Sequence, residues 1–227
     1  EKALKVRMSK VSPLKHLVLG PPDLHDVMKF LAKYYFTREN IRLGVGFNTV
    51  SRNDEEIIQH CLELGVAVGS REQTGRLVGV ILCCFITADS SWYSDETKCT
   101  SQAEVAATRI VNMAKSLVDL FEDPTVKKVL YLKASCVHPD YARQGICKKL
   151  LEMCVDLGVE RGCQMAVGVT TSTYVQNICL ELGYENRATL DLNEVKESLL
   201  DLSRVNNTKF IVITKHLSPN HKVISKI

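Results

Sequence analysis

A segment near the middle of the chain combines a glycine and basic side chains at a position where a phosphate could bind. Residues 129–137 have the pattern of a strand, Pro139 ends it, and Gly145 precedes an amphipathic helix expected over residues 146–160. The first N–H groups of a helix lack internal partners and attract an anion, and a glycine lets that anion approach the backbone closely. Positive charge is supplied by Arg143, Lys148 and Lys149. The segment predicts an anion-binding helix start, with an ordinary solvated strand–loop–helix unit as the alternative.

The composition is that of a globular protein of 227 residues, 45% hydrophobic and 24% charged. No Pro-, Gly- or Ser-rich stretch marks a linker, so we expect a single domain over residues 1–227. The net charge of +3 is too small to indicate a nucleic-acid-binding face. The longest apolar run, residues 78–86, is too short to span a membrane. We expect a monomer without nucleic-acid or membrane partners.

The nine cysteines are an odd number and include no CxxC pair. The first residues alternate charged and apolar side chains and do not have the pattern of a signal peptide. Reduced thiols, a cytoplasmic location and no metal site are therefore expected.

The spacing of apolar residues predicts alternating strands and helices. Strands are expected at residues 4–8, 65–72, 76–86, 129–137 and 165–169, from Tyr184 onward, and at 209–215. Helices are expected over residues 21–36, over 55–64 with Asn53 and Asp54 as N-cap, and over 103–121, 146–160 and 172–182. Residues 87–101 are expected to form a polar loop. The alternation indicates a mixed α/β or α+β fold around one central sheet.

The anion-binding segment resembles the acetyl-CoA-binding signature of the GCN5-related N-acetyltransferases (GNAT). That signature has Val-x-Pro-x-Tyr after a strand, then Gln/Arg-x-x-Gly-x-Gly/Ala at the start of a helix. The chain matches at Val137, Pro139, Tyr141 and Gly145 and departs at Ala142 and Cys147. Downstream, residues 177–184 are similar to the family's helix that begins with Asn and ends in Leu-Gly-Phe. The two resemblances imply an acetyltransferase that uses acetyl-CoA.

The resemblance implies an α+β (mixed α/β) GNAT fold: a twisted, mostly antiparallel sheet of about seven strands with helices on both faces. It places the acetyl-CoA-binding core at residues 129–190. The implied cofactor-binding residues are Cys136, Val137, Ala142, Arg143, Gln144, Gly145, Ile146, Cys147, Lys148 and Asn177. A main-chain amide at Cys136 or Val137 is expected to stabilise the oxyanion. The family's proton-donating tyrosine falls on Cys179, either a core thiol or a replacement donor.

The N-terminal part is similar to the insect-type arylalkylamine N-acetyltransferases, which acetylate amines such as dopamine, serotonin and octopamine. Their first helix ends in Phe-Phe-x-x-Glu-Pro, where this chain has Tyr35-Phe36-Thr-Arg-Glu39-Asn40. The resemblance makes Glu39 the base that deprotonates the ammonium, because only a neutral amine attacks a thioester. It also implies two hydroxyl residues, which fall on Thr171 and on Val175, with Ser172 adjacent. The candidate catalytic residues are Glu39, Thr171 and Ser172.

Alternatives remain for the base and for the function. His138 could titrate near neutrality and is the rival base. The aromatic residues that could line an acceptor pocket are Tyr34, Tyr35, Phe36, Trp92 and Tyr93. The expected function is acetyl transfer to a small arylalkylamine in a ternary complex. The alternatives are another amine (a polyamine, an amino acid, or a protein N-terminus or lysine) and a non-catalytic acyl-CoA-binding module.

Overall fold

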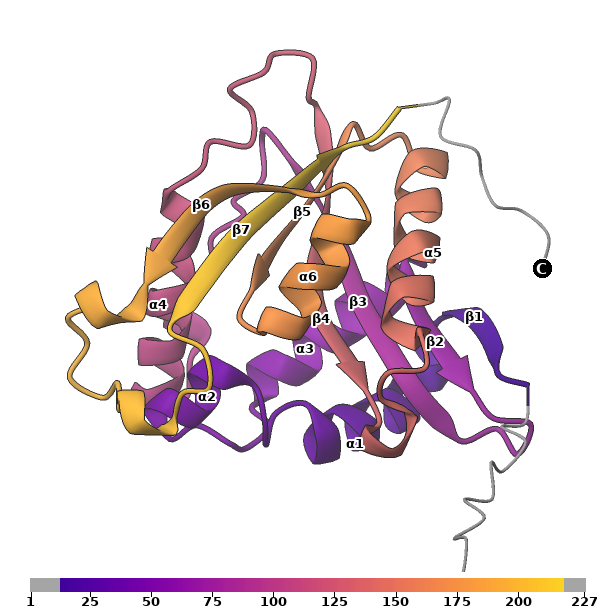
Figure 1. Ribbon diagram of the computed structural model, residues 1–227, viewed down its shortest axis with the longest axis horizontal. Helices are drawn as coiled ribbons and strands as arrows, with labels where there is room; N and C mark the ends of the chain where they lie inside the picture. Colours follow the sequence, from indigo (N-terminus) through magenta and orange to yellow (C-terminus); the bar gives the residue numbers. More distant parts are fainter. Residues whose placement is uncertain (1–12, 219–227) are drawn as a thin grey trace, which may run out of the picture.

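The computed structural model describes residues 13–218, which build one seven-stranded sheet (Figure 1). The strand order is β1-β2-β3-β4-β5-β7-β6. The strands are β1 (Lys15–Leu19), β2 (Ala67–Arg71), β3 (Leu77–Thr87), β4 (Lys128–Val137), β5 (Met165–Thr170), β6 (Glu185–Asp191) and β7 (Lys209–His216). Neighbouring strands are antiparallel except β4 and β5, which are parallel. The expected mixed fold with a mostly antiparallel sheet is confirmed.

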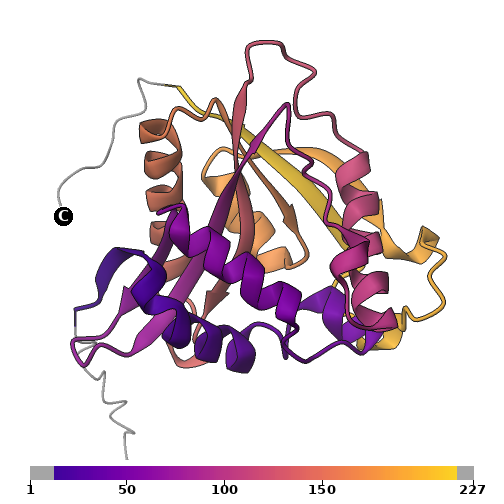
Figure 2. The ribbon, with the colours of Figure 1, turned by 180° about the vertical axis from the view of Figure 1, so that it is seen from behind.

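Helices cover both faces of this sheet. The α-helices are α1 (Leu24–Tyr34), α2 (Asn40–Val45), α3 (Arg52–Glu63), α4 (Gln102–Ser116), α5 (Ile146–Glu160) and α6 (Thr173–Glu181). Short 3₁₀ turns lie at Pro21–Asp23, Glu96–Lys98, Pro139–Tyr141, Leu192–Glu194 and Leu202–Arg204. Helices α5 and α6 lie on the face toward the viewer in Figure 1, and α1, α3 and α4 lie on the opposite face, seen in Figure 2. Hydrophobic cores therefore lie on both sides of the sheet, among them one beneath α5 and one beneath α1 and α3.

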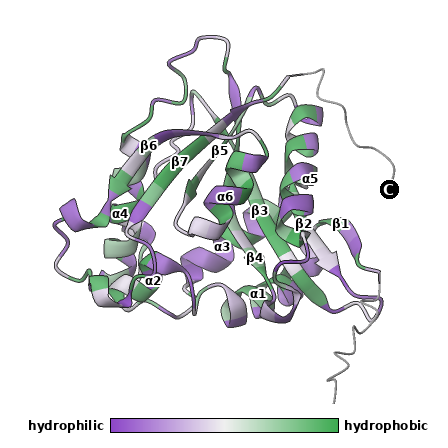
Figure 3. Ribbon diagram, in the orientation of Figure 1, coloured by the Kyte–Doolittle hydropathy of each residue, from purple (hydrophilic) through white to green (hydrophobic). Residues whose placement is uncertain are grey.

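Strand β3 supplies both cores because successive side chains of a strand point to opposite faces. Ile81 packs into the core beneath α5, whereas Leu82 packs into the core beneath α1 and α3. This double burial explains the long apolar run of the strand, and Figure 3 shows the hydrophobic colour concentrated on the central strands. No helix among residues 13–218 is both long enough and apolar enough to cross a bilayer.

One sequence expectation lies outside the described residues, and two others differ from the structure in detail. The strand expected at residues 4–8 lies outside the described residues, and the first described strand is β1. The N-cap of α3 is Ser51, not Asn53 or Asp54: Ser51 Oγ accepts from Asp54 N at 3.1 Å while Asp54 Oδ2 accepts from Ser51 N at 2.9 Å. Helix α4 ends at Ser116 rather than near residue 121. Beyond it, Asp119 Oδ1 accepts from Phe121 N at 2.9 Å, a local bond that favours a turn over a helix.

Candidate active site

The sheet splits at the middle of β4. Strands β4 and β5 pair from Val129 and Met165 up to Leu132 and Gly168, where the pairing stops, whereas β4 stays paired with β3 up to Val137. A β-bulge lies at the same point, since Leu82 pairs with Ala134 and Cys83 with Leu132, which leaves Lys133 as the extra residue. A cavity of about 460 Å³, the central cavity, opens in the split between residues 132–137 of β4 and 168–170 of β5.

Two further cavities adjoin the central one. The rear cavity, about 150 Å³, lies among α1, α3, α4 and β4 and shares with the central cavity Tyr35, Glu39, Lys133, Ala134, Val169 and Thr171. The loop cavity, about 170 Å³, lies at the start of α5 and shares with the central cavity Ser135, Val137, Tyr174 and Val175. The three cavities therefore form a series that runs from the start of α5 through the split to the opposite face of the sheet.

The loop cavity has the properties of an anion site. Gly145 is the N-cap of α5 with φ of 76°, in the left-handed region, and α5 has no side-chain cap, so its first N–H groups remain available. A Cβ placed on Gly145 would meet no atom within 4 Å, so open space lies beside the backbone. The predicted residues that line this cavity are Val137, Ala142, Arg143, Gly145, Ile146, Cys147 and Lys148. A phosphate fits this helix start.

The remaining predicted cofactor-binding residues are placed differently. Cys136 lines the central cavity, and Gln144 borders a neighbouring hollow of about 260 Å³ together with His16 and Lys149. Asn177 is exposed on α6 and lines none of these cavities. The buried amide of α6 is its neighbour Gln176, whose Nε2 donates to Thr170 O at 3.0 Å and to Lys209 O at 3.1 Å. Gln176 thus fixes the start of α6 against β5 and β7.

Glu39 lies at the boundary of the central and rear cavities, but not at the end of the first helix. Helix α1 ends at Tyr34, and Glu39 instead caps α2, where its Oε2 accepts from Arg42 N at 2.9 Å. The hydroxyl of Thr171 donates to Glu39 Oε1 at 2.8 Å. Two of the three candidate catalytic residues, 132 positions apart in the sequence, are therefore in direct contact. Ser172 lines the central cavity as the N-cap of α6.

Helix α2 positions this glutamate and has no counterpart among the helices expected from the sequence. The side chain of Asn40 is buried; its Nδ2 donates to Asn207 O at 2.5 Å, and its Oδ1 accepts from Asn206 N at 2.7 Å. These bonds join α2 to the segment before β7. The signal available in the sequence was Gly46, which ends α2 in the left-handed conformation with φ of 71°.

The main chain of Val137 faces the split. His138 N donates to Val78 O of β3 at 2.9 Å, so the peptide group of His138 points to β3. Since peptide groups alternate in direction along a strand, the N–H of Val137 points away from β3 and that of Cys136 points toward it. Of the two residues expected to supply an oxyanion-stabilising amide, Val137 has the required direction.

The rival base His138 lines none of the three cavities. Its ring is buried, with Nε2 2.9 Å from the Tyr34 hydroxyl and 2.7 Å from Arg76 Nη2. Burial, and then the charge of Arg76, lower the pKa of His138 below its ordinary value. The arrangement describes a residue that ties the loop after β4 to α1.

Cys179 is a core thiol in contact with the cavity wall. Its side chain is 0% exposed, and burial raises the pKa of its thiol to about 12. The folded thiol is therefore protonated at neutral pH. We expect Cys179→Ala to keep kcat within about twofold and to leave the alkaline limb of the pH–rate profile unchanged. Steady-state rates from pH 6 to 10 test this; a loss of kcat with intact thermal stability would make Cys179 the proton donor.

Comparison with known proteins identifies the family. Residues 47–184 match the model of the acetyltransferase (GNAT) family. The chain belongs to this family. It is accordingly an N-acetyltransferase that uses acetyl-CoA, and the GNAT match covers the split, the loop cavity and α6.

Solved structures share the fold of this acetyltransferase at low sequence identity. Arylalkylamine N-acetyltransferase 2 from Aedes aegypti is 16% identical, with 91% of this chain and 100% of that chain covered and a TM-score of 0.83. Polyamine N-acetyltransferase from Drosophila melanogaster, which forms N-acetylagmatine, is 17% identical, with 90% and 100% covered and a TM-score of 0.78. Arabidopsis thaliana Naa50, in complex with a CoA–peptide bisubstrate analogue, is 11% identical, with 89% and 97% covered and a TM-score of 0.54. The search of curated proteins found no match.

Proposed function

We propose that this N-acetyltransferase transfers acetyl from acetyl-CoA to the primary amine of a small arylalkylamine, directly and within a ternary complex. The observation that carries the proposal is the contact between Thr171 and Glu39 where the central and rear cavities meet. This contact places a carboxylate between the donor-side cavity and the rear cavity on the other face of the sheet.

The donor side has groups suited to the pyrophosphate of acetyl-CoA and to the chain that links this pyrophosphate to the thioester. The free N–H groups of α5, with Arg143 and Lys148 beside them, would hold the phosphates. The residues shared by the loop and central cavities, Ser135, Val137, Tyr174 and Val175, mark the route from the phosphates to the split. Asn177, exposed on α6, has a weaker case as a donor contact than the loop residues.

The acceptor side supplies the base and a surface for a ring. Tyr35, Phe36, Phe47 and Tyr131 line the rear cavity, and aromatic side chains pack favourably against an aryl group. Glu39 Oε1 accepts from Thr171, and Glu39 Oε2 caps α2, so both oxygens are held in place. An alkylammonium is mostly charged at neutral pH, so Glu39 would remove one proton, directly or through water, before attack.

The transfer step balances on these groups. The neutral amine nitrogen forms a bond to the acetyl carbon, the carbonyl electrons move onto oxygen, and the main-chain N–H of Val137 donates to that oxyanion. Collapse of the intermediate breaks the C–S bond, CoA leaves as a thiolate, and the proton of the attacking nitrogen is transferred to that thiolate. Ser135 and Tyr174 both line the loop and central cavities, and their hydroxyls are the candidates to relay this proton.

A thiol-release assay with acetyl-CoA tests the proposal. Tyramine, tryptamine and phenethylamine would be compared with spermidine, agmatine and short peptides with free N-termini. We expect kcat/KM for the best aryl acceptor to exceed that of the polyamines and peptides at least about tenfold. Preference for a peptide or a polyamine would refute the arylalkylamine assignment. Tight acetyl-CoA binding without thiol release for any amine would support a binding module instead.

A further inference from the structure

Lys133 occupies an unusual position in the active site. It is the extra residue of the β-bulge on β4, and it lines both the central and the rear cavities together with Glu39 and Thr171. Bulges redirect side chains near active sites. The Nζ of Lys133 lies 5.6 Å from the ring centroid of Tyr131, which places the ammonium on the rear side of the sheet.

This ammonium has no counter-ion in the part of the chain that the structure describes. Lys133 forms no ion pair and no side-chain hydrogen bond among residues 13–218, although it is partly buried. A partly buried charge without a partner carries a desolvation cost, which an opposite charge on a ligand would offset.

Three acidic groups line the rear cavity, and each accepts hydrogen bonds from other groups: Glu39 from Arg42 N and the Thr171 hydroxyl, and Asp54 and Glu104 as follows. Asp54 pairs with Arg42 and accepts from Ser51. Glu104 accepts from Ser51 Oγ at 2.7 Å and from Thr100 N at 2.8 Å. Burial alone would raise the pKa of Glu104, but the hydrogen bonds from Thr100 and Ser51 lower it overall, so this carboxylate is ionised. None of the three carboxylates forms an ion pair with Lys133.

A second lysine lies beside the same aromatic ring. Lys115 of α4 is 1% exposed, and its Nζ lies 5.1 Å from the same Tyr131 ring, where it donates to Trp92 O at 2.6 Å and to Ser94 Oγ at 3.1 Å. Burial, and then the charge of Lys133, lower the pKa of Lys115 to about 7. Two amines therefore border Tyr131, and within residues 13–218 neither contacts a carboxylate.

We propose that Lys133 binds a carboxylate of the acceptor, so that the preferred acceptor is an arylalkylamine that also carries a carboxylate, such as an aromatic amino acid. The inference rests on the proposed function, because Glu39 must receive the amine of the same molecule. One carboxylate and one unpaired ammonium at the junction of two cavities complement a zwitterion. The same ammonium repels the second cationic group of a polyamine, which makes diamines poor acceptors.

Two matched pairs of acceptors test this assignment: tyrosine with tyramine, and tryptophan with tryptamine. The members of each pair differ only in the carboxylate. We expect the wild type to have a higher kcat/KM for the amino acid than for the amine. Lys133→Met should lower the ratio of these two kcat/KM values at least about tenfold, mainly by raising KM for the amino acid. Lys133→Glu should lower this ratio further and raise kcat/KM for agmatine. Methionine keeps the apolar stem, and thermal unfolding checks that each variant is folded.

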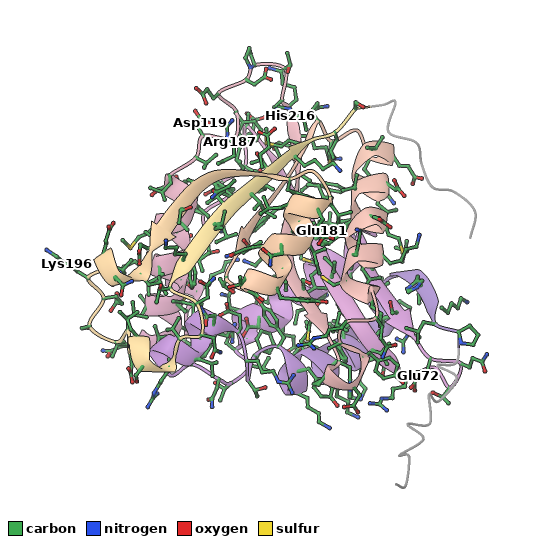
Figure 4. The ribbon with its side chains drawn as sticks, viewed as in Figure 1. Glu72, Asp119, Glu181, Arg187, Lys196 and His216 are labelled. Atoms are coloured by element: carbon green, nitrogen blue, oxygen red, sulfur yellow. The ribbon has the colours of Figure 1, made fainter. Side chains whose placement is uncertain are left out.

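The control is Lys196→Met, because Lys196 is exposed and projects away from the body of the protein in Figure 4. This variant should keep the wild-type ratio. If Lys133→Met keeps the wild-type ratio of kcat/KM values and the enzyme acetylates both tyramine and tyrosine, the role of Lys133 is overturned. The proposed function would remain intact in that case.

Calorimetric titration of the same acceptors into enzyme saturated with CoA tests the carboxylate-binding role of Lys133 separately from the proposed acetyl transfer. Binding of tyrosine that weakens at least about tenfold in Lys133→Met supports the carboxylate site even if turnover is absent, an outcome in which the proposed function alone fails. Equal affinity of wild type and variant for tyrosine in this titration refutes the carboxylate site.

Discussion

Glu39→Gln is expected to lower kcat/KM for the amine about a hundredfold at neutral pH, within the usual range for loss of a general base. Glutamine has the size of glutamate and can still accept from Arg42 N through its amide oxygen, so the cap of α2 is kept. The variant therefore removes the base without removing the support of the helix. Thermal unfolding should show a melting temperature within a few degrees of the wild type.

The dependence of this loss on pH distinguishes a base from a structural residue. As the pH approaches the pKa of an alkylamine, about 10, solution supplies neutral amine and the variant should recover toward the wild-type rate. Thr171→Val removes the hydroxyl bonded to Glu39 and should cost less, about three- to tenfold. Glu194→Gln, an exposed glutamate, is the control and should not change the rate. Wild-type turnover by Glu39→Gln at neutral pH would exclude Glu39 as the base.

Gly145→Ala is expected to raise KM for acetyl-CoA about tenfold with little change in kcat. Alanine in the left-handed conformation costs about 1–2 kcal/mol, which favours a rearranged start of α5, and its Cβ enters the open space that borders the loop cavity. Both effects weaken the arrangement of backbone N–H groups that would hold a phosphate. Steady-state kinetics with acetyl-CoA varied at saturating amine measure the change.

The same helix provides a matched control at its other end. Gly162, just beyond α5, has φ of 74°, and a Cβ there would also meet no atom within 4 Å. Gly162→Ala should therefore lower the melting temperature about as much as Gly145→Ala but leave KM for acetyl-CoA at the wild-type value. Equal values of KM in the two variants would show that the start of α5 does not hold the donor.

Elements with strong local signals could be predicted from the sequence. Helix α5 has the expected bounds because its apolar spacing is regular and glycine precedes it, and the β2–β3 hairpin follows from two apolar runs around a Gly75 turn. Helix α2 has only six residues, too few for a periodic pattern, and it is stabilised by bonds from Asn40 to the segment before β7. Its existence depends on contacts that link distant parts of the chain.

The site was predictable where a local signal or a resemblance to a known family pointed to it. The anion-binding character of the α5 start follows from Gly145 and its neighbours alone. The contact between Glu39 and Thr171 depends on how the start of α2 meets the end of β5, which no local pattern encodes. The position of Lys133 depends on the register of β3 with β4, because a shift by one residue would move its side chain to the other face.

The end of β4–β5 pairing at Leu132 and Gly168 also has a thermodynamic consequence. Peptide groups of β4 beyond that point have a strand partner on one side only, so the free enzyme keeps donors and acceptors that solvent or a ligand must satisfy. A ligand that bonds to them binds the folded chain in preference to the unfolded one, and its binding energy adds to the free energy of unfolding. Substrate occupancy and local order of the sheet are therefore linked, and amide hydrogen exchange along residues 133–137 would slow as acetyl-CoA binds.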